Sequence, residues 1–182
     1  MAEPVALVAC RRIVLVGFMG SGKTSVGREL AALTGFSFLD LDALVEERTG
    51  RTVAETFRVS GERGFRDEER AAARLAAARD DCVIAAGGGA FAEAETRAIL
   101  RRGAVCVYLR CDLETILRRL PADNSRPLAG NRERMTALLS AREPSYQAAD
   151  VSVDGSHGTP AELACEIVRA LASPGLERDE RR

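Results

Sequence analysis

The sequence predicts a three-layer α/β fold, in which helices cover both faces of a central parallel sheet of about five strands. Short apolar runs alternate with longer segments of helical spacing along the chain. This alternation is typical of parallel sheets with right-handed crossovers. The chain has 182 residues, of which 46% are hydrophobic, so it can bury the core of one such domain. We therefore expect a single domain over residues 1–182.

The first predicted strand leads into a glycine-rich loop with the pattern of a phosphate-binding P-loop. An apolar run over residues 13–16 comes first, the loop spans 17–24, and residues 25–33 have the spacing of an amphipathic helix. Glycines let successive backbone N–H groups turn toward a phosphate, and the helix N-terminus adds partial positive charge. Lys23 would reach the β- and γ-phosphates, and the Thr24 hydroxyl would ligate Mg²⁺.

Lys23 is the only lysine of the chain, and every other basic residue is an arginine. A compact ammonium group is not interchangeable with a guanidinium in a tight phosphate cradle, which favours a functional lysine here. With no second lysine, a guanine-reading Asn/Thr-Lys-x-Asp motif is impossible, and the strand that would carry a usual Walker-B aspartate ends in glycine. Both observations weaken the GTPase and motor-like ATPase classes and leave the kinases.

A second strand is predicted over residues 36–40, and it ends in the pair Asp40 and Asp42. One of these aspartates could face a Mg²⁺ ion beside Thr24 while the other points into a pocket for the phosphate acceptor. Without the glycine loop they would be interpreted as strand-end and helix N-cap residues. Beside that loop, we expect them to be site residues.

The region of about residues 43–80 is polar and predicted to be helical in three pieces. Gly50 would end the first piece as a C-cap. Thr52 would open the second, because Glu55 stands at capping-box spacing. The stretch 61–64 contains two glycines and should separate the second piece from the third. The expected pieces are residues 43–50, a short helix from 52, and a long helix over 65–79.

The second half of the chain continues the alternation. Residues 82–86 are apolar throughout, as expected for a strand buried on both faces, and lead into Gly87, Gly88 and Gly89. The remaining predicted elements are helix 93–102 stopped by Gly103, strand 104–109, helix 112–120 with Asp112 at its N-cap, a loop over about 121–131, helix 132–147, strand 151–153, a helix opened by a capping box from Thr159 to Glu162, and a polar tail over 173–182.

The functional candidates follow the strands directly, where the ligand site of a parallel sheet lies. Three arginines have two interpretations each. Arg126, in the loop 121–131, could arrive with a lid and stabilise phosphoryl transfer, or it could be an ordinary solvated loop residue. Arg66 and Arg142 could clamp a carboxylate bidentately, or they could lie on exposed helix surfaces.

Composition excludes several other classes. The net charge of −1, with both signs spread along the chain, gives no polyanion-binding face, so we expect no nucleic-acid partner. Residues 1–10 lack a basic start and a cleavage site, and no apolar run reaches membrane-spanning length, so we expect a soluble, cytoplasmic protein without a membrane partner. Five cysteines without a C-x-x-C pair and one histidine, His157, disfavour a redox centre, a His-ligated metal and a His-based triad.

Taken together, these motifs resemble the shikimate kinase family. Besides the glycine loop and the two aspartates, the resemblance rests on three motifs in this order: Gly61-Glu62-x-x-Phe65-Arg66-x-x-Glu69, Gly87-Gly88-Gly89 and Arg126-Pro127-Leu128. It covers residues from about 12 to about 170. It implies a P-loop kinase fold with a substrate-binding region over about 43–80 and a lid over about 121–131. The implied reaction is ATP-dependent phosphorylation of the 3-hydroxyl of shikimate, toward chorismate and the aromatic amino acids, by a monomer.

The resemblance also implies a role for each matching residue. The residues implied to hold the ATP phosphates are Gly20, Ser21, Gly22, Lys23, Thr24 and Ser25. The ligands implied for Mg²⁺ are Thr24 and Asp40. The residues implied to bind shikimate are Asp42, Arg66, the Gly88 backbone N–H and Arg142, with Glu69 positioning Arg66. Arg118 would flank the adenine and Arg126 would be the lid arginine, so the implied catalytic set is Lys23, Asp42 and Arg126. The loop 155–159 lacks an arginine that the family pattern leads us to expect.

Two alternatives stay open. A related small-molecule kinase, acting on gluconate or a nucleoside monophosphate, would use the same P-loop, although a neutral acceptor would not require Arg66 and Arg142 together. A nucleotide-binding relative without turnover would keep the fold, but it would have no need of Asp42 as an acceptor ligand or of Arg126 in a lid.

Overall fold

A five-stranded parallel sheet forms the central layer of the computed structural model, which describes residues 11–120 and 132–172. The strand order is β2-β3-β1-β4-β5, and every neighbouring pair is parallel. The strands are β1 (Arg12–Val16), β2 (Ser37–Asp40), β3 (Cys82–Ala85), β4 (Val105–Arg110) and β5 (Val151–Asp154). The predicted sheet is confirmed in strand number and direction.

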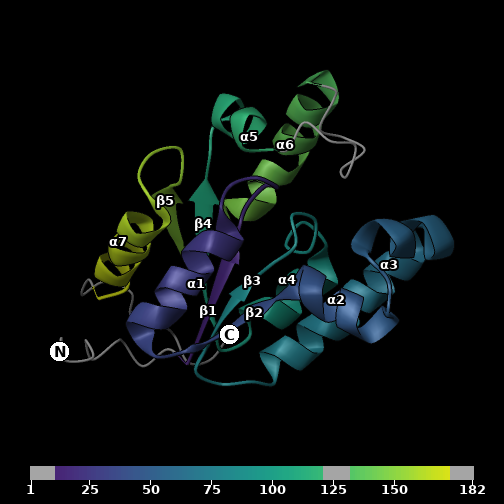
Figure 1. Ribbon diagram of the computed structural model, residues 1–182, viewed down its shortest axis with the longest axis horizontal. Helices are drawn as coiled ribbons and strands as arrows, with labels where there is room; N and C mark the ends of the chain where they lie inside the picture. The colour runs from purple at the N-terminus through teal and green to yellow at the C-terminus, as the bar shows by residue number, and fades with distance from the viewer. Residues whose placement is uncertain (1–10, 121–131, 173–182) are drawn as a thin grey trace.

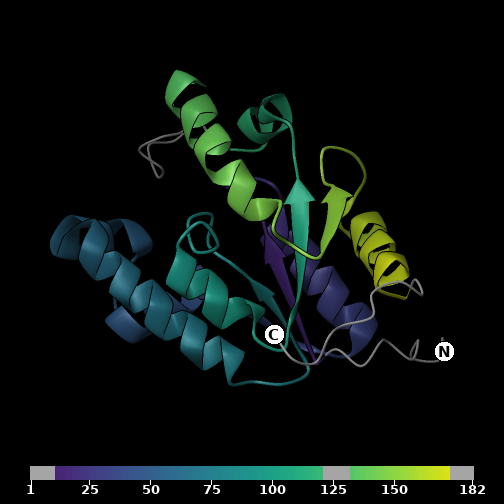
Figure 2. The ribbon, with the colours of Figure 1, turned by 180° about the vertical axis from the view of Figure 1, so that it is seen from behind.

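Helices cover both faces of this sheet, so the three-layer prediction is also confirmed (Figure 1; Figure 2). Helices α1 and α7 pack on one face, and α2 to α6 supply the core of the other. The helices are α1 (Lys23–Thr34), α2 (Leu41–Thr49), α3 (Val53–Ala77), α4 (Ala94–Arg101), α5 (Leu113–Arg119), α6 (Arg132–Tyr146) and α7 (Pro160–Ala172).

The apolar strands divide their side chains between two cores. In β1, Val14 and Val16 face the core built with α2 to α6, whereas Ile13 and Leu15 face the core built with α1 and α7. All four are at most 1% exposed. Burying a side chain of this size contributes about 1.5–3 kcal/mol, which is why an unbroken apolar run marks a central strand.

The predicted helix ends agree with the structure at several positions. Gly50 takes the left-handed conformation after α2, with φ of 64°. Thr52 and Glu55 form the expected capping box at the start of α3, and the same reciprocal pattern opens α7. Asp112 caps α5, where its carboxylate accepts from the Thr115 N–H at 2.8 Å.

The predicted break over residues 61–64 is confirmed at Gly61 and is narrower than the predicted stretch. Helix α3 runs from Val53 to Ala77, and only Gly61 leaves the helical conformation, with φ of 68° and ψ of −179°. Side chains other than glycine rarely adopt such a backbone, which explains Gly61. Gly64 is helical, and a Cβ there would lie 2.5 Å from the Ser60 Cβ, so close packing explains this glycine. The second and third predicted helices are therefore confirmed as two helical segments of α3, which meet at a sharp kink at Gly61 without an intervening loop.

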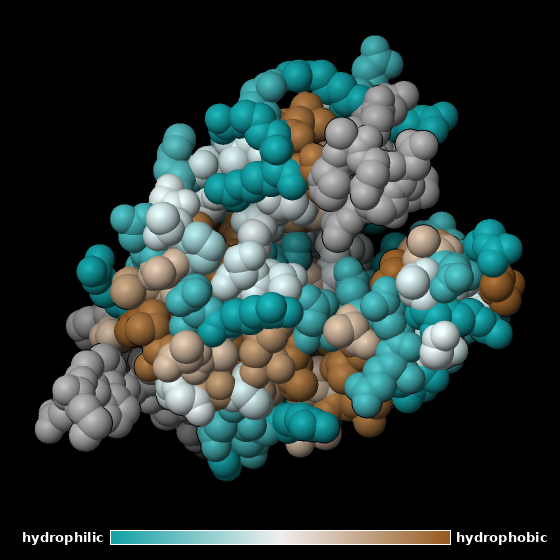
Figure 3. Space-filling model, viewed as in Figure 1, coloured by the Kyte–Doolittle hydropathy of each residue, from teal (hydrophilic) through white to brown (hydrophobic). Residues whose placement is uncertain are grey.

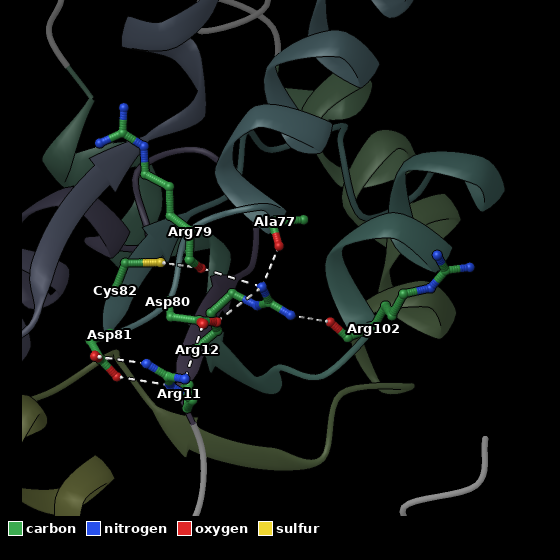
Figure 4. A network of polar contacts seen from close by, with 8 residues as sticks. All are labelled: Arg11, Arg12, Ala77, Arg79, Asp80, Asp81, Cys82 and Arg102. Carbon is green, nitrogen blue, oxygen red and sulfur yellow. Dashed lines mark hydrogen bonds and ion pairs between the residues drawn. The ribbon is translucent and has the colours of Figure 1, made fainter.

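Arg12, the first residue of β1, joins the C-terminal ends of two helices (Figure 4). Its guanidinium donates to the carbonyls of Ala77, the last residue of α3, and Arg79, and at 2.8 Å to the carbonyl of Arg102, directly after α4. It also pairs with Asp80 at 3.6 Å, and its side chain is only 13% exposed. One cation thus satisfies carbonyls that helix ends leave without partners.

The predicted lid, its Arg126 and the predicted polar tail lie outside the described residues. Within the described ranges, no helix is long and apolar enough to cross a membrane. The face in Figure 3 carries its apolar side chains in small groups among hydrophilic ones.

Candidate active site

A cleft of about 420 Å³ lies where the carboxyl ends of the strands meet the P-loop. The groups predicted after the first three strands all contribute to it. Its walls are the P-loop and the start of α1, the aspartates after β2, the end of β3 with the first two glycines that follow, and a second side made of Arg119, Gly158, Pro160 and Leu163. Every residue from Gly20 to Ser25 that was predicted to hold phosphates lines the cleft.

The P-loop has the backbone that its glycines predict. Gly17, Gly20 and Gly22 all have positive φ, and a Cβ on Gly17 would lie 2.7 Å from the Leu109 carbonyl oxygen. Lys23 is the first residue of α1, and its Nζ donates to the carbonyls of Gly17 at 3.0 Å and Phe18 at 2.8 Å. The ammonium group therefore lies over the loop beside a helix N-terminus, where an anion is favoured.

Thr24 and Asp40 supply neighbouring oxygen atoms at one edge of the cleft. The Thr24 hydroxyl donates to Asp40 Oδ2 at 2.8 Å, and Asp40 Oδ1 caps α2 by accepting from the Asp42 N–H at 3.0 Å. A hydroxyl and a carboxylate are suitable ligands for Mg²⁺, which usually keeps several waters and binds substrate phosphates as well. This hydroxyl and carboxylate therefore fit such an ion.

The first and third glycines after β3 make room for charged side chains. A Cβ on Gly87 would lie 2.8 Å from Asp42 Oδ1 and 3.0 Å from Glu69 Oε1, so two carboxylates approach this residue. A Cβ on Gly89 would lie 2.6 Å from Arg66 Nη1. Glu69 holds that same nitrogen at 2.7 Å, as predicted for a residue that positions Arg66.

Glu69 is the buried acidic group of this cluster, with a side chain 2% exposed. Burial raises the pKa of Glu69, because a carboxylate loses its hydration there; the positive charge of Arg66 opposes this effect, and the nearby Asp42 adds to it. The contact with Glu69 therefore fixes the Arg66 side chain, but burying the Glu69 carboxylate lowers the stability of the fold.

Gly88, the second of the three glycines, forms hydrogen bonds with two side chains of α6. Arg142 donates from Nη1 to the Gly88 carbonyl at 3.1 Å, and the Tyr146 hydroxyl donates to the same oxygen. The two arginines predicted to clamp an acceptor thus come from α3 and α6 to adjacent glycines. Tyr146 was not among the predicted site residues; its position one turn after Arg142 was the available signal.

On the wall of the cleft that faces the P-loop, the structure distinguishes two neighbouring arginines of α5. Arg118, predicted to flank the adenine, donates to the Thr115 hydroxyl at 2.8 Å and does not line the cleft formed by the described residues. Arg119 lines the cleft, donates to the Gly155 carbonyl at 2.9 Å and lies 3.5 Å from the Ser21 carbonyl. Successive helical residues point about 100° apart, so the two side chains leave α5 in different directions.

The fold and this site define a P-loop kinase: a parallel sheet, a P-loop between β1 and α1, a threonine hydroxyl beside an aspartate after β2, and arginines and carboxylates around the three glycines after β3. Residues 19–172 match the family model described as shikimate kinase. A shikimate kinase of Moorella thermoacetica is 49% identical over 162 residues, covering 87% of this chain and 93% of the relative. The chain belongs to the shikimate kinase family, as its motifs indicated.

Solved structures of similar fold include a member of the same family. Shikimate kinase from Acinetobacter baumannii, in complex with shikimate, has a TM-score of 0.88 and 36% identity, covering 93% of this chain and 97% of its own. A gluconokinase from Sinorhizobium meliloti has a TM-score of 0.60 and 24% identity, covering 89% of this chain and 91% of its own. At that identity the second likeness shows the fold alone.

Proposed function

We propose that the protein transfers the γ-phosphoryl group of ATP to the 3-hydroxyl of shikimate, yielding shikimate 3-phosphate and ADP on the route to chorismate. The observation that carries this proposal is the position of Arg66 and Arg142 at adjacent glycines, in the neighbourhood of Asp42 and the P-loop cleft. Two guanidinium groups suit a carboxylate, and an aspartate suits the hydroxyls of the same small molecule.

The ATP phosphates would be bound by backbone N–H groups from Gly20 to Ser25 and by Lys23. The ammonium of Lys23 would exchange its two carbonyl partners for phosphate oxygens when ATP enters. Arg119 faces the cleft together with Gly158 and Pro160, which supports it, in place of Arg118, as the arginine beside the base. It would also supply the guanidinium that the loop 155–159 lacks.

Thr24 and Asp40 would hold Mg²⁺, whose contribution is to offset negative charge on the phosphates. Their 2.8 Å contact supports this assignment, since the two oxygens already lie side by side. Asp40 is fixed from behind by its bond to the start of α2.

On the acceptor side, Arg66 and Arg142 would bind the carboxylate of shikimate, with the Gly88 N–H lining the same pocket. Asp42 would orient the 3-hydroxyl and accept its proton as the new O–P bond forms and the bond to the ADP oxygen breaks. Arg126 would complete the charge compensation from the lid, a role that can contribute about 10³ to 10⁵ in rate.

The experiment is a substrate panel. Purified protein with ATP and Mg²⁺ is assayed for ADP release with shikimate, gluconate, AMP or CMP, and without acceptor. Strong turnover with shikimate alone is expected. Turnover only with AMP or CMP would reject the carboxylate clamp by Arg66 and Arg142, and turnover only with gluconate would reject shikimate as the acceptor but keep that clamp. No turnover with any acceptor would favour a nucleotide-binding relative.

We further infer a monomer acting in the cytoplasm, without nucleic-acid or membrane partners. The family resemblance and the mixed surface charge support this inference. Sedimentation of the purified protein at assay concentration should give a mass near 19.5 kDa.

A further inference from the structure

The hydrogen bond between Tyr146 and Gly88, beside the proposed acceptor pocket of Asp42, Arg66 and Arg142, has no role in the proposed function. Tyr146 is the last residue of α6, its side chain is fully buried, and its hydroxyl donates to the Gly88 carbonyl. The partner atom is significant because Arg142 donates to the same oxygen at 3.1 Å. Arg142 and Tyr146 stand four residues apart on one helix face, so a single turn of α6 holds one backbone carbonyl twice.

The ring of Tyr146 is itself fixed. It packs against the ring of Tyr108 on β4, with centroids 5.3 Å apart. The hydroxyl also stays protonated at any ordinary assay pH, because burial raises the pKa of Tyr146 to about 12. Tyr146 is therefore a rigid and permanent donor, unlike the longer and more flexible side chain of Arg142.

The Gly88–Gly89 peptide, which carries this carbonyl, lines the proposed acceptor pocket. A Cβ on Gly88 would lie 3.3 Å from the Met19 backbone nitrogen and 3.7 Å from Arg142 Nη1, so the residue lies between the P-loop and α6. In a planar trans peptide, the N–H of Gly89 points opposite to the Gly88 carbonyl. Fixing the carbonyl toward α6 thus sets the orientation of the whole Gly88–Gly89 peptide.

We propose that Tyr146 is a positioning residue for the anionic acceptor, acting through the Gly88 carbonyl that it shares with Arg142. When the guanidinium of Arg142 turns to the carboxylate of the acceptor, the carbonyl keeps the tyrosine hydroxyl as its partner, so the glycine peptide does not move. Without the hydroxyl, Arg142 is the remaining donor to that oxygen, and acceptor binding competes with a buried hydrogen bond. This inference rests on the proposed function, since it concerns the same acceptor.

The test is the Tyr146→Phe variant, which keeps the ring and removes only the donor. Loss of one hydrogen bond predicts an increase of about five- to ten-fold in the KM for shikimate. The kcat and the KM for ATP should stay within about two-fold, because the P-loop and Asp42 are untouched. The matched control is Tyr108→Phe, which removes the neighbouring hydroxyl. No polar contact among the described residues joins that hydroxyl to Gly87, Gly88 or Gly89, so the KM of this variant for shikimate should be unchanged.

A double-mutant cycle with Arg142→Ala tests the shared carbonyl. If Tyr146 acts through Arg142, adding Tyr146→Phe to Arg142→Ala should raise the KM for shikimate much less than it does alone. Equal effects in both backgrounds would overturn the proposal. So would a KM in Tyr146→Phe equal to that of the unaltered protein, or a fall in melting temperature without any change in KM.

The unaltered protein separates this inference from the function on which it rests. If it turns over shikimate and the variant behaves identically, the positioning role alone is wrong. If it does not turn over shikimate, the proposed function fails and the positioning role fails with it.

Discussion

Replacing Glu69 by glutamine should weaken acceptor binding and at the same time leave the fold as stable or more stable. The side chain is 2% exposed and receives the Arg66 guanidinium at 2.7 Å. Glutamine has the same shape and still offers a carbonyl oxygen to Arg66. It removes the negative charge, so a charge-assisted bond becomes an ordinary one of about half the strength.

The two effects can be estimated separately. A loss of about 1 kcal/mol in the contact that holds Arg66 predicts a KM for shikimate about five-fold higher. In the opposite direction, burial of an ionised carboxylate costs a few kcal/mol, of which the arginine returns only part. We expect the free energy of unfolding at pH 8 to be unchanged or higher by up to about 2 kcal/mol, with about 2–4 °C in melting temperature per kcal/mol.

The pH dependence gives the sign of the electrostatic effect. Burial raises the pKa of Glu69 from its ordinary value of 4.5, so the folded state binds the proton more tightly than the unfolded state. Stability from this proton is fully present below the unfolded pKa and is lost as the pH rises through the folded pKa. The stability of Glu69→Gln relative to the unaltered protein should therefore increase between about pH 5 and pH 8.

Urea denaturation across this pH range and steady-state kinetics at pH 8 would measure both effects. Glu62→Gln is the matched control, because this carboxylate lies 3.6 Å from the same arginine but is 76% exposed, and we expect neither effect. A relative stability that falls with pH, or a KM for shikimate that stays unchanged, would refute the reasoning.

Three further substitutions should each change a different measured quantity: turnover, the KM for shikimate, or the free energy of unfolding. Asp42→Asn should leave ATP binding nearly intact by calorimetry and remove most turnover; near-normal turnover would reject its role. Gly89→Ala places a Cβ within 2.7 Å of both terminal nitrogens of Arg66, so the KM for shikimate should rise about ten-fold while the KM for ATP stays constant. Arg12→Ala should lower the free energy of unfolding by about 2–4 kcal/mol without changing either KM, whereas Arg102→Ala, which keeps the carbonyl that Arg12 binds, should have little effect (Figure 4).

The sequence was informative where a residue's role depends on its immediate neighbours. Buried strands appear as unbroken apolar runs, and the P-loop is a local pattern of strand, glycines and helix. The break in α3 shows the limit, since the sequence has glycines at 61 and 64 and only Gly61 bends the chain. Their difference lies in packing, because Gly64 is required by its proximity to Ser60.

Residues that act over long sequence distances could not be assigned in advance. Arg12 binds carbonyls that lie 65 to 90 positions away, at helix ends whose place depends on the finished sheet. Arg118 and Arg119 are identical in chemistry, and only the exact phase of α5 decides which one faces the nucleotide side of the cleft. Such choices follow from the packed structure and have no local signal.

The positive and negative charges around Gly87, Gly88 and Gly89 come from separate motifs, so no single motif predicts their sum. Two guanidiniums, from Arg66 and Arg142, meet two carboxylates, from Asp42 and Glu69, around three successive glycines. With all four groups ionised, the cluster is neutral. Burial raises the pKa of Glu69, so this carboxyl loses its negative charge at a higher pH than an exposed glutamate as the pH falls. Glutamine at position 69 would leave this cluster with one net positive charge, which should favour an anionic acceptor over a neutral one of the same shape, while it loosens the contact that holds Arg66.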